Sequence, residues 1–447
     1  MKHHHLRPQQ DFVQMDSASA EMRARNTKLG QFYLAHLKKY PLFELLIPWI
    51  WGRLYDLYRF GWILVFGKRL RRPLLPMATF VAASRRAVVS MPQIVATPFP
   101  AVSPESGRKH LTSPDSEYEF PELYIADICD AMVTGGTNLI LANNSVICHD
   151  LYEFTHDYTS EELHWRTYIW PARHQLAWLM STTPALEFER AACFTDACAF
   201  NYAHWITEVL PRINLLCRTG MLPDAQLIVD EGLHDNLIES LRAVTGDTRE
   251  IVTLPKGICA RVKHLAYISV TGYVPFERRS NRLKNHSHGR FSPFALQSLG
   301  HRFAERTITP SSSQARRVFV KRNSAVRNII NSHEIEEILI AHGFAVVEPE
   351  QLTFAQQVAL FSNVDIVVGA TGAAMANLVF CKPTTRIIIL ISCYRHTSYW
   401  YWQNMACAVG NRINYVLGKT AWSALAGIHS DYRINPSDLL DAIGEVK

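Results

Sequence analysis

Between residues 317 and 391 the chain alternates short apolar runs with segments of helical character, and this alternation constrains the fold more than any other feature of the sequence. Strands are predicted at four runs rich in β-branched and aromatic residues, 318–320, 344–347, 364–368 and 386–391. Helices are predicted between them, at residues 331–342, 353–361 and 373–379. Repeated units of this kind fold as a parallel sheet covered on both faces, so the sequence predicts an α/β protein.

The third predicted strand runs directly into a loop of small residues, 369–373, which contains two glycines and precedes a helix. Such a loop lets backbone N–H groups approach a phosphate, with the positive end of the helix dipole behind them. Small residues at a strand–helix junction also occur where elements simply pack tightly. Ligands of parallel sheets bind at the carboxyl ends of the strands, where we expect Lys321, Arg322, Glu350 and this loop.

Two of the predicted helices begin with capping patterns. Asn331 precedes Glu334 by three residues, and Thr353 precedes Gln356 by the same spacing, which is typical of a capping box. A further helix is predicted from Pro436 to the end of the chain, within the terminal segment 431–447.

The length and the cysteine pattern limit the class of protein. A chain of 447 residues, 48% hydrophobic and 19% charged, is folded and long enough for two domains plus an extra segment. Its nine cysteines are scattered without a C-x-x-C pair, which indicates reduced thiols in a cytosolic setting rather than disulfides or a zinc site. His3, His4 and His5 are either a tag remnant or native, and no site role is expected of them.

The positive charge is concentrated near the N-terminus. Residues 1–110 hold 17 Lys and Arg against 6 Asp and Glu, whereas the rest of the chain holds 29 against 34. A nucleic-acid enzyme is more often basic around its site, so nucleic acid is not expected as a partner.

Within this basic arm, residues 41–67 are rich in large apolar and aromatic side chains, with Lys38, Lys39 and residues 68–72 flanking them. Charged residues interrupt the segment, and its longest uncharged runs fall far short of the roughly 20 residues that a membrane span needs. One interpretation is a helix lying in the interface of an anionic membrane leaflet. The other is a helix packed on the protein's own core or on a partner.

A second cluster of polar residues lies at 201–212. With Asn201 as N-cap and a helix from Tyr202, His204 and Glu208 stand one turn apart on the same face, and Pro211 is expected to kink or end the helix. A carboxylate one turn away orients an imidazole and raises its basicity, as a general base requires. The alternative is an ordinary surface pair without a catalytic role.

The run Asn-Tyr-Ala-His-Trp-Ile-Thr-Glu-Val-Leu-Pro-Arg at 201–212 resembles the N-terminal signature of glycosyltransferase family 61. Three later segments resemble further motifs of that family in the same order: 318–331, 343–361 and 368–383. The resemblance covers roughly residues 115 to 420. Many members carry His where this chain has Thr371, so no proton-transfer role is assigned to that position, although its hydroxyl can hydrogen-bond a phosphate oxygen.

The resemblance implies a GT-B-like fold, with two Rossmann-like domains and a cleft between them. The corresponding division is a basic amphipathic arm at 1–114, an acceptor-binding domain at 115–285, a nucleotide-sugar-binding domain at 286–430 and the terminal helix at 431–447. Residues 73–114 are rich in proline and are expected to be an extended or weakly ordered connection.

The resemblance also implies sugar transfer with inversion at the anomeric carbon. His204 is then the expected base, with Glu208 as its orienting partner or as the base itself. The donor-binding set is Lys321, Arg322, Arg327, Glu350, Thr371, Gly372, Ala373 and Asn377, and the acceptor-binding set is Asn201, Trp205 and Arg212. No two aspartates stand two apart, so the Asp-x-Asp motif of metal-dependent glycosyltransferases is missing, and neither an essential metal nor another cofactor is expected.

The sequence therefore predicts a hexosyl- or pentosyltransferase that moves a sugar from a nucleotide-sugar to a glycan or lipid-linked glycan in capsular or exopolysaccharide biosynthesis. It is expected in the cytoplasm, peripheral on the inner face of the cytoplasmic membrane. The alternative is a non-catalytic scaffold of the same fold in a membrane-associated polysaccharide assembly complex.

Overall fold

The computed structural model describes most of the chain after residue 69. The described residues are 57, 61, 63, 65, 67, 70–111, 116–163, 166–246, 249–275, 277, 278, 289–304, 315–322, 327–394, 397, 399–420 and 430–444. The predicted amphipathic segment 41–67 lies largely outside them. Among the helices in the described part, none combines the length and apolar character needed to cross a bilayer.

The C-terminal part of the chain builds a seven-stranded sheet in the order β20-β19-β21-β22-β23-β24, with β4 also beside β23. Its strands are β4 (Ala101–Ser103), β19 (Arg317–Val320), β20 (Ala345–Val347), β21 (Ile366–Ala370), β22 (Arg386–Cys393), β23 (Ile413–Thr420) and β24 (Tyr432–Arg433). All ladders of this sheet are parallel except the one between β23 and β24. The four strands predicted from the apolar runs are confirmed, and so is their parallel pairing.

The helices of this part follow the predicted order. They are α10 (Ser332–Ala341), η6 (Pro349–Gln351), α11 (Phe354–Phe361), η7 (Ala373–Phe380), α12 (Trp400–Ala408) and α13 (Pro436–Ile443). The capping box of Thr353 and Gln356 is present at the start of α11, with both reciprocal hydrogen bonds formed. The helix expected after the glycine loop is a 3-10 helix, η7, and the terminal helix begins at Pro436 as predicted.

An eleven-stranded sheet is built by residues from 71 to 268. Its order is β10-β11-β1-β8-β7-β6-β15-β12-β13-β14, with β2 also beside β6. Its strands are β1 (Arg71–Pro76), β2 (Arg86–Val89), β6 (Leu123–Thr134), β7 (Ile140–Ala142), β8 (Ser145–Cys148), β10 (Thr167–Trp170), β11 (Gln175–Trp178), β12 (Leu186–Cys193), β13 (Gln226–Asp230), β14 (Ile251–Leu254) and β15 (Cys259–Ile268). The four strands β15, β12, β13 and β14 are mutually parallel, whereas β6 runs antiparallel to β15, so this sheet is mixed.

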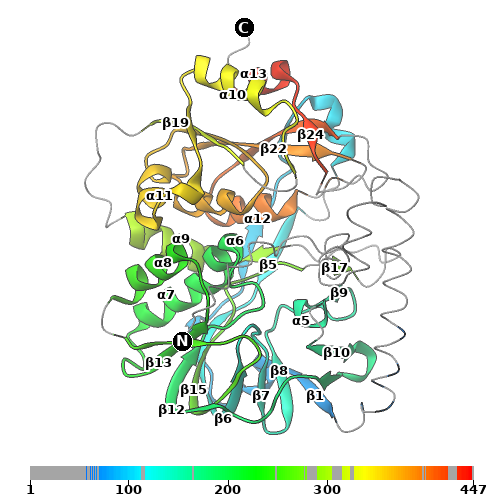
Figure 1. Ribbon diagram of the computed structural model, residues 1–447, viewed down its shortest axis with the longest axis vertical. Helices are drawn as coiled ribbons and strands as arrows, with labels where there is room; N and C mark the ends of the chain where they lie inside the picture. Colours follow the sequence, from blue (N-terminus) through cyan, green and yellow to red (C-terminus); the bar gives the residue numbers. More distant parts are fainter. Residues whose placement is uncertain are drawn as a thin grey trace, which may run out of the picture.

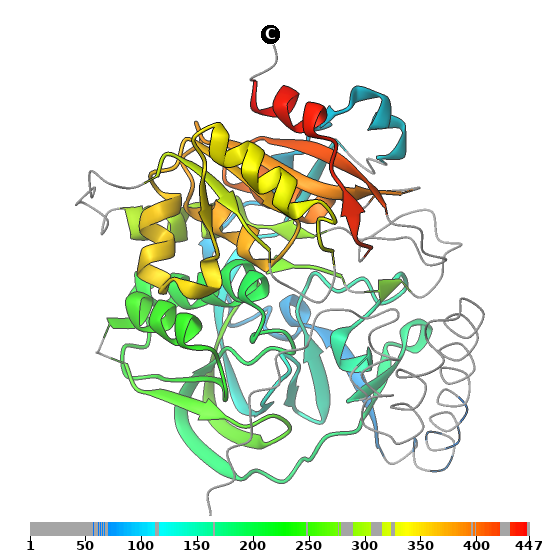
Figure 2. The same cartoon turned by 45° about the horizontal axis from the view of Figure 1, so that its top comes forward.

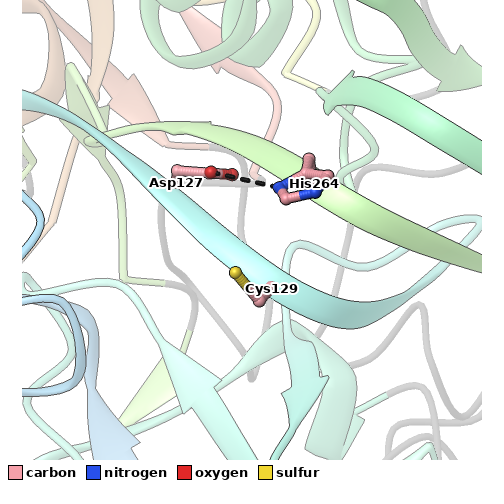
Figure 3. Close-up of side chains that lie close together, drawn as sticks. All are labelled: Asp127, Cys129 and His264. Carbon is pink, nitrogen blue, oxygen red and sulfur yellow. Dashed lines mark hydrogen bonds and ion pairs between the residues drawn. The ribbon is translucent and has the colours of Figure 1, made fainter.

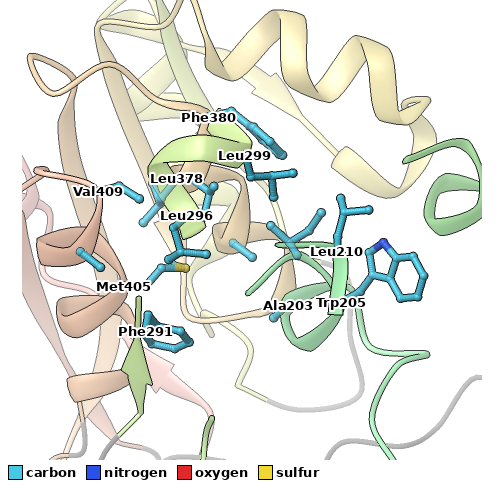
Figure 4. Packing of buried hydrophobic residues seen from close by; sticks show 14 of the residues in the cluster. Ala203, Trp205, Leu210, Phe291, Leu296, Leu299, Leu378, Phe380, Met405 and Val409 are labelled. Carbon is cyan, nitrogen blue, oxygen red and sulfur yellow. The ribbon is translucent and has the colours of Figure 1, made fainter. Parts of the chain in front are cut away.

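A band of helices lies between the two sheets (Figures 1 and 2). It contains α6 (Tyr202–His204), α7 (Leu210–Thr219), α8 (Asp235–Thr245) and α9 (Pro293–Ala304), together with α11 and α12. Their apolar side chains share one buried cluster, which includes Leu210 of α7, Leu296 of α9, Leu378 of η7 and Met405 of α12 (Figure 4). The two sheets are therefore joined by a common hydrophobic core.

The remaining elements are short, and six of the strands among them form three separate two-stranded sheets, β3-β5, β9-β17 and β16-β18. They are α4 (Met77–Phe80), β3 (Gln93–Ala96), η2 (Glu105–His110), β5 (Glu117–Phe120), β9 (Asp157–Tyr158), α5 (Ser160–Leu163), η3 (Pro171–Arg173), η4 (Trp205–Val209), β16 (Gly272–Tyr273), β17 (Glu277–Arg278) and β18 (Arg290–Phe291).

The expectation of an extended or weakly ordered connection at residues 73–114 is wrong for its described part. β1 and β2 belong to the eleven-stranded sheet, and β4 pairs with β23 of the other sheet. The ladder partners of β4 are about three hundred residues further along the chain, at Asn414, Tyr415 and Val416. Because such pairing depends on distant residues, the local pattern of prolines and short apolar runs does not reveal it.

Candidate active site

Arg322 and Gly372 meet at the carboxyl edge of the seven-stranded sheet. Arg322 follows β19 and Gly372 follows β21, two strands that are neighbours in the sheet. A Cβ atom added to Gly372 would collide with Nη1 of Arg322, so the absence of a side chain lets the guanidinium lie against the loop backbone. The structure thus brings together the arginine and the small-residue loop that the sequence predicts at this edge.

Arg327 adds a second cation beside Arg322. It is 7% exposed, and its Nε atom has no hydrogen-bond partner among the residues that the structure describes. Burial, reinforced by the charge of Arg322, lowers the pKa of Arg327 to about 10. Its φ of 60° lies in the left-handed region, which is uncommon for a residue other than glycine and is often found at functional sites.

The other charged residues of the predicted donor set take different positions. The ammonium of Lys321 forms an ion pair with Glu336 of α10 at 2.9 Å, and this hydrogen bond raises the pKa of Lys321. Burial lowers the pKa of Arg322, whereas the negative charge of Glu350 acts in the opposite direction. Glu350 is exposed, and its negative charge acts on the guanidinium of Arg322. The charge of Lys321 is instead paired with that of Glu336.

The remaining predicted donor residues belong to the loop and to η7. Thr371 is 1% exposed, and its backbone N–H donates to the carbonyl of Leu390. Asn377 is fully buried, and its side chain bonds to three partners inside the protein: Oδ1 accepts from Tyr202, and Nδ2 donates to Gln357 and to the carbonyl of Ala374. Both amide atoms of Asn377 are therefore used internally. Ala373 is half-buried at the start of η7, packed against the shared core.

His204 and Glu208 form the predicted one-turn pair. The side chain of Asn201 caps α6 by accepting from the backbone N–H of Ala203 at 2.9 Å. His204 ends α6 and Glu208 lies in the π-helical turn η4, with 2.6 Å between His204 Nδ1 and Glu208 Oε1. The helix does not end at Pro211, because α7 continues to Thr219. The π-helical turn η4, just before the proline, is wider than an α-helical turn and accommodates the proline ring and the lack of a backbone N–H there.

The environment of this pair suits proton transfer. The two side chains are 12% and 11% exposed, so each is largely removed from water. Burial by itself lowers the pKa of His204, but the adjacent carboxylate of Glu208 outweighs it and raises that pKa above its ordinary value. Burial also raises the pKa of Glu208, against the opposing effect of His204. A histidine held by a carboxylate in this way can accept a proton from a hydroxyl.

The helix η7 links the His204–Glu208 pair to the cationic edge. The hydroxyl of Tyr202, two residues before His204, donates to Oδ1 of Asn377 at 2.6 Å. Asn377 lies in η7, whose N-cap is Gly372, the residue that contacts Arg322. Tyr202 thus contacts the middle of η7 through Asn377, and Arg322 contacts the residue that precedes this helix.

The three predicted acceptor-binding residues are occupied inside the protein. Asn201 caps α6, as described above. Trp205 is fully buried, and its indole N–H donates to Ser240 Oγ at 2.7 Å. Arg212 is 4% exposed, donates to the carbonyl of Ile268 and lies over the rings of Phe194 and Tyr267. These contacts give all three a role in packing this region.

Two carboxylates near the pair, half-buried Asp196 and buried Asp230, were not predicted from the sequence. Asp196 follows β12 and Asp230 ends β13, where the carboxyl ends of two parallel strands meet. Asp230 Oδ2 accepts from the backbone N–H of Asp196, and burial raises the pKa of Asp230 to about 7. The charge of Asp196 also acts on His204 and Glu208. The signal available in the sequence was an aspartate at or shortly after the carboxyl end of each strand.

The parallel sheet and the paired arginines at its edge define a mixed α/β protein whose polar side chains gather where such folds bind ligands. Residues 202–388 match the family model described as Glycosyltransferase 61. This match supports the resemblance to glycosyltransferase family 61 seen in the motifs of the chain. Glycosyltransferases act on a sugar donor and an acceptor, and the match to residues 202–388 supports this class of activity. No curated protein matches the chain.

Proposed function

We propose that this protein is an inverting glycosyltransferase that needs no divalent metal. It transfers a hexose or pentose from a nucleotide-sugar to a glycan or lipid-linked glycan during surface polysaccharide biosynthesis. The donor binds at the carboxyl edge of the seven-stranded sheet, in a nucleotide-sugar domain at 286–430. The acceptor binds over an acceptor domain at 115–285, in a GT-B arrangement with a cleft between the two.

The observation that carries this proposal is the pair of arginines at the loop. Arg322 lies against Gly372, and its charge acts on the buried guanidinium of Arg327. Two neighbouring cations, one buried and the other half-buried, are stabilised by a bound anion. A nucleoside diphosphate carries adjacent phosphates, and as a leaving group it develops negative charge that guanidinium groups can stabilise.

The His204–Glu208 pair supplies the second requirement of the reaction. Inverting transfer takes place by in-line attack of the acceptor hydroxyl on the anomeric carbon, while a base removes the hydroxyl proton. His204 accepts this proton at its imidazole, and Glu208 stabilises the imidazolium that results. The oxygen–carbon bond to the acceptor forms as the bond to the nucleoside diphosphate breaks, and the diphosphate leaves with the bonding electrons.

The test is titration calorimetry of the purified chain with UDP, CDP and GDP in EDTA, followed by turnover with the corresponding nucleotide-sugars. Binding of one diphosphate and turnover unchanged by EDTA support the proposal. A strict requirement for Mn²⁺ or Mg²⁺ contradicts the role given to the arginines. If none of the diphosphates binds, the alternative of a non-catalytic scaffold in a polysaccharide assembly complex replaces the enzyme.

The basic N-terminal segment before β1 supports a location on the cytoplasmic face of the membrane. Its segment 41–67 combines apolar and aromatic residues with flanking Lys and Arg, a pattern typical of helices that lie on anionic leaflets. Such a location gives access to acceptors that are linked to lipids.

A further inference from the structure

A group of three metal-binding residue types lies outside the proposed active site, on two neighbouring strands of the eleven-stranded sheet. Asp127 and Cys129 are two residues apart on β6, so both project from the same face. His264 on β15 is directly opposite Cys129 in the antiparallel ladder. Figure 3 shows these three side chains on their two strands, with the contact between Asp127 and His264 drawn as a dashed line.

The geometry of the group is close to what a small metal ion requires. Nδ1 of His264 is 3.3 Å from Oδ2 of Asp127, and one ligand atom from each of the three residues lies within 4.8 Å of the other two. In a tetrahedral zinc site the metal–ligand distances of about 2.0 to 2.3 Å place the ligand atoms roughly 3.3 to 3.7 Å apart. The Asp127–His264 distance already falls in this range, and the thiol needs a shift of about 1 Å at most.

The local backbone keeps the three donors accessible on one open face. Asp127 and His264 have side chains that are 52% and 44% exposed, and Cys129 is exposed. The next residue, Asp130, has a φ of 52°, an uncommon left-handed conformation for a residue other than glycine. At this residue the alternation of buried and exposed side chains along β6 is interrupted. Ile128 before it and Ala131 and Val133 after it are all buried in the same cluster. Asp127 and Cys129 therefore face away from that core.

We propose that Asp127, Cys129 and His264 bind one divalent ion of the zinc class. A thiolate, an imidazole and a carboxylate together favour Zn²⁺, Co²⁺ or Ni²⁺ over Mg²⁺ or Mn²⁺, which prefer oxygen ligands alone. Three protein ligands leave the fourth position to water. The ion would join β6 to β15 at a point separate from the His204–Glu208 pair, so this site does not depend on the proposed transferase mechanism.

The test is titration of the full chain with Co²⁺ in a buffer free of chelating thiols, with the cobalt–thiolate charge-transfer absorption as the readout. His3, His4 and His5 offer imidazoles of their own, so total bound metal would not report on this site. We expect a thiolate band that saturates near one equivalent, disappears on adding Zn²⁺ and is unaffected by Mg²⁺. Cys129→Ser should abolish the band, and His264→Ala and Asp127→Asn should weaken Co²⁺ binding by about tenfold or more.

Cys393→Ser is the matched control, because Cys393 is a half-buried thiol of the other sheet and should leave the band unchanged. Zn²⁺ should also raise the thermal unfolding midpoint of the wild-type chain but not that of Cys129→Ser. Absence of a thiolate band in the wild type, or its persistence in Cys129→Ser, overturns the proposal. Nucleoside-diphosphate affinity measured on Cys129→Ser should equal that of the wild type, which separates failure of this site from failure of the proposed function.

Discussion

At the scale of single residues, Arg322 is the side chain on which donor binding should depend most. It lies against the loop that follows β21, and its charge reinforces that of buried Arg327. Arg322→Ala should weaken nucleoside-diphosphate affinity by about 1.5 to 3 kcal/mol, the range for a hydrogen bond to a charged group. Arg316→Ala is the matched control, because Arg316 precedes the opposite end of β19 and pairs with Asp365 on the surface. The measurement is calorimetry of nucleoside-diphosphate binding to the two variants. If Arg322→Ala binds the diphosphate as tightly as Arg316→Ala does, Arg322 is not part of the site.

Gly372 offers a second test of the same contact without removing a charge. In Gly372→Ala the new methyl group occupies the place of Nη1 of Arg322, and the end of a flexible arginine side chain can move aside at little cost to folding. We therefore expect weaker diphosphate binding with a nearly unchanged unfolding midpoint. The double variant with Arg322→Ala should bind no more weakly than Arg322→Ala alone, because the two changes disrupt one interaction. Fully additive losses would mean that Gly372 acts independently of Arg322.

His204 is the residue whose loss should affect turnover most. Removing a positioned general base costs about 10² to 10⁴ in rate, or roughly 3 to 5.5 kcal/mol of activation free energy. His204→Ala should lose that much in kcat while still binding a nucleoside diphosphate, because the arginines belong to the other sheet. Near-normal kcat in this variant would assign His204 to packing.

The pH profile separates the two candidate bases. Glu208 raises the pKa of His204, and the imidazole must be neutral to accept a proton, so activity should rise with pH through that raised pKa. Glu208→Gln removes the negative charge and should move this acidic limb to lower pH, with a smaller loss of kcat than in His204→Ala. A loss as large as or larger than in His204→Ala would instead identify Glu208 as the base. The measurement is kcat/KM against pH for the three proteins.

At the scale of elements, η7 is the connection between the two parts of the proposed site, and Asn377 is its main polar contact. Asn377→Ala leaves the hydroxyl of Tyr202 and the amide of Gln357 without their buried partner. The free energy of unfolding should fall by about 2 to 6 kcal/mol, since each of these two unsatisfied buried groups costs about 1 to 3 kcal/mol. Tyr202→Phe should cost less, and the two losses should not add. A variant of normal stability with weakened diphosphate binding would restore the donor-contact role predicted from the sequence.

The elements that the sequence predicted well are those defined by their own local pattern. β19, β21 and β22 are buried strands of a parallel sheet, so each appears as a continuous apolar run, and α11 begins with a capping box that four residues define. β4 was missed because its partners lie in β23, far along the chain. The π turn η4 was missed because Pro211 indicates a break in a helix without indicating how the chain accommodates it.

The same distinction applies to the candidate site. Arg322 and Gly372 were predicted together because both follow strands of one parallel sheet, and that sheet brings their carboxyl ends to one edge. Trp205 and Arg212 belong to the family signature, but their burial depends on helices and strands that a local pattern does not place. Asp196 and Asp230 meet only through the pairing of β12 with β13, so their proximity required the structure.

At the scale of the whole molecule, the segment before residue 112 joins the two sheets. β1 begins at Arg71, whose guanidinium lies 4.6 Å from the ring centroid of Trp170, and β4 extends the other sheet. The sheets also share the core around α7, α9, η7 and α12. Removing β1 or β4 would therefore disturb the fold itself. A test of the basic arm must end before β1.

The membrane-surface role of the arm should be tested by deleting residues 1–67, which leaves β1 intact. The full chain should sediment with anionic liposomes at low salt and be released as salt increases, because each Lys or Arg near such a surface contributes about 1 kcal/mol and salt screens this attraction. The deleted protein should not sediment.

A full-length variant with Lys38→Glu and Lys39→Glu should sediment more weakly while keeping the apolar segment, which separates charge from hydrophobic contact. Neutral liposomes are a second control, because they keep the apolar bilayer and remove the electrostatic attraction. Equal sedimentation of the full and deleted chains would assign the segment 41–67 to packing against the protein or a partner, and the lipid-linked acceptor would then have to reach the enzyme by another surface.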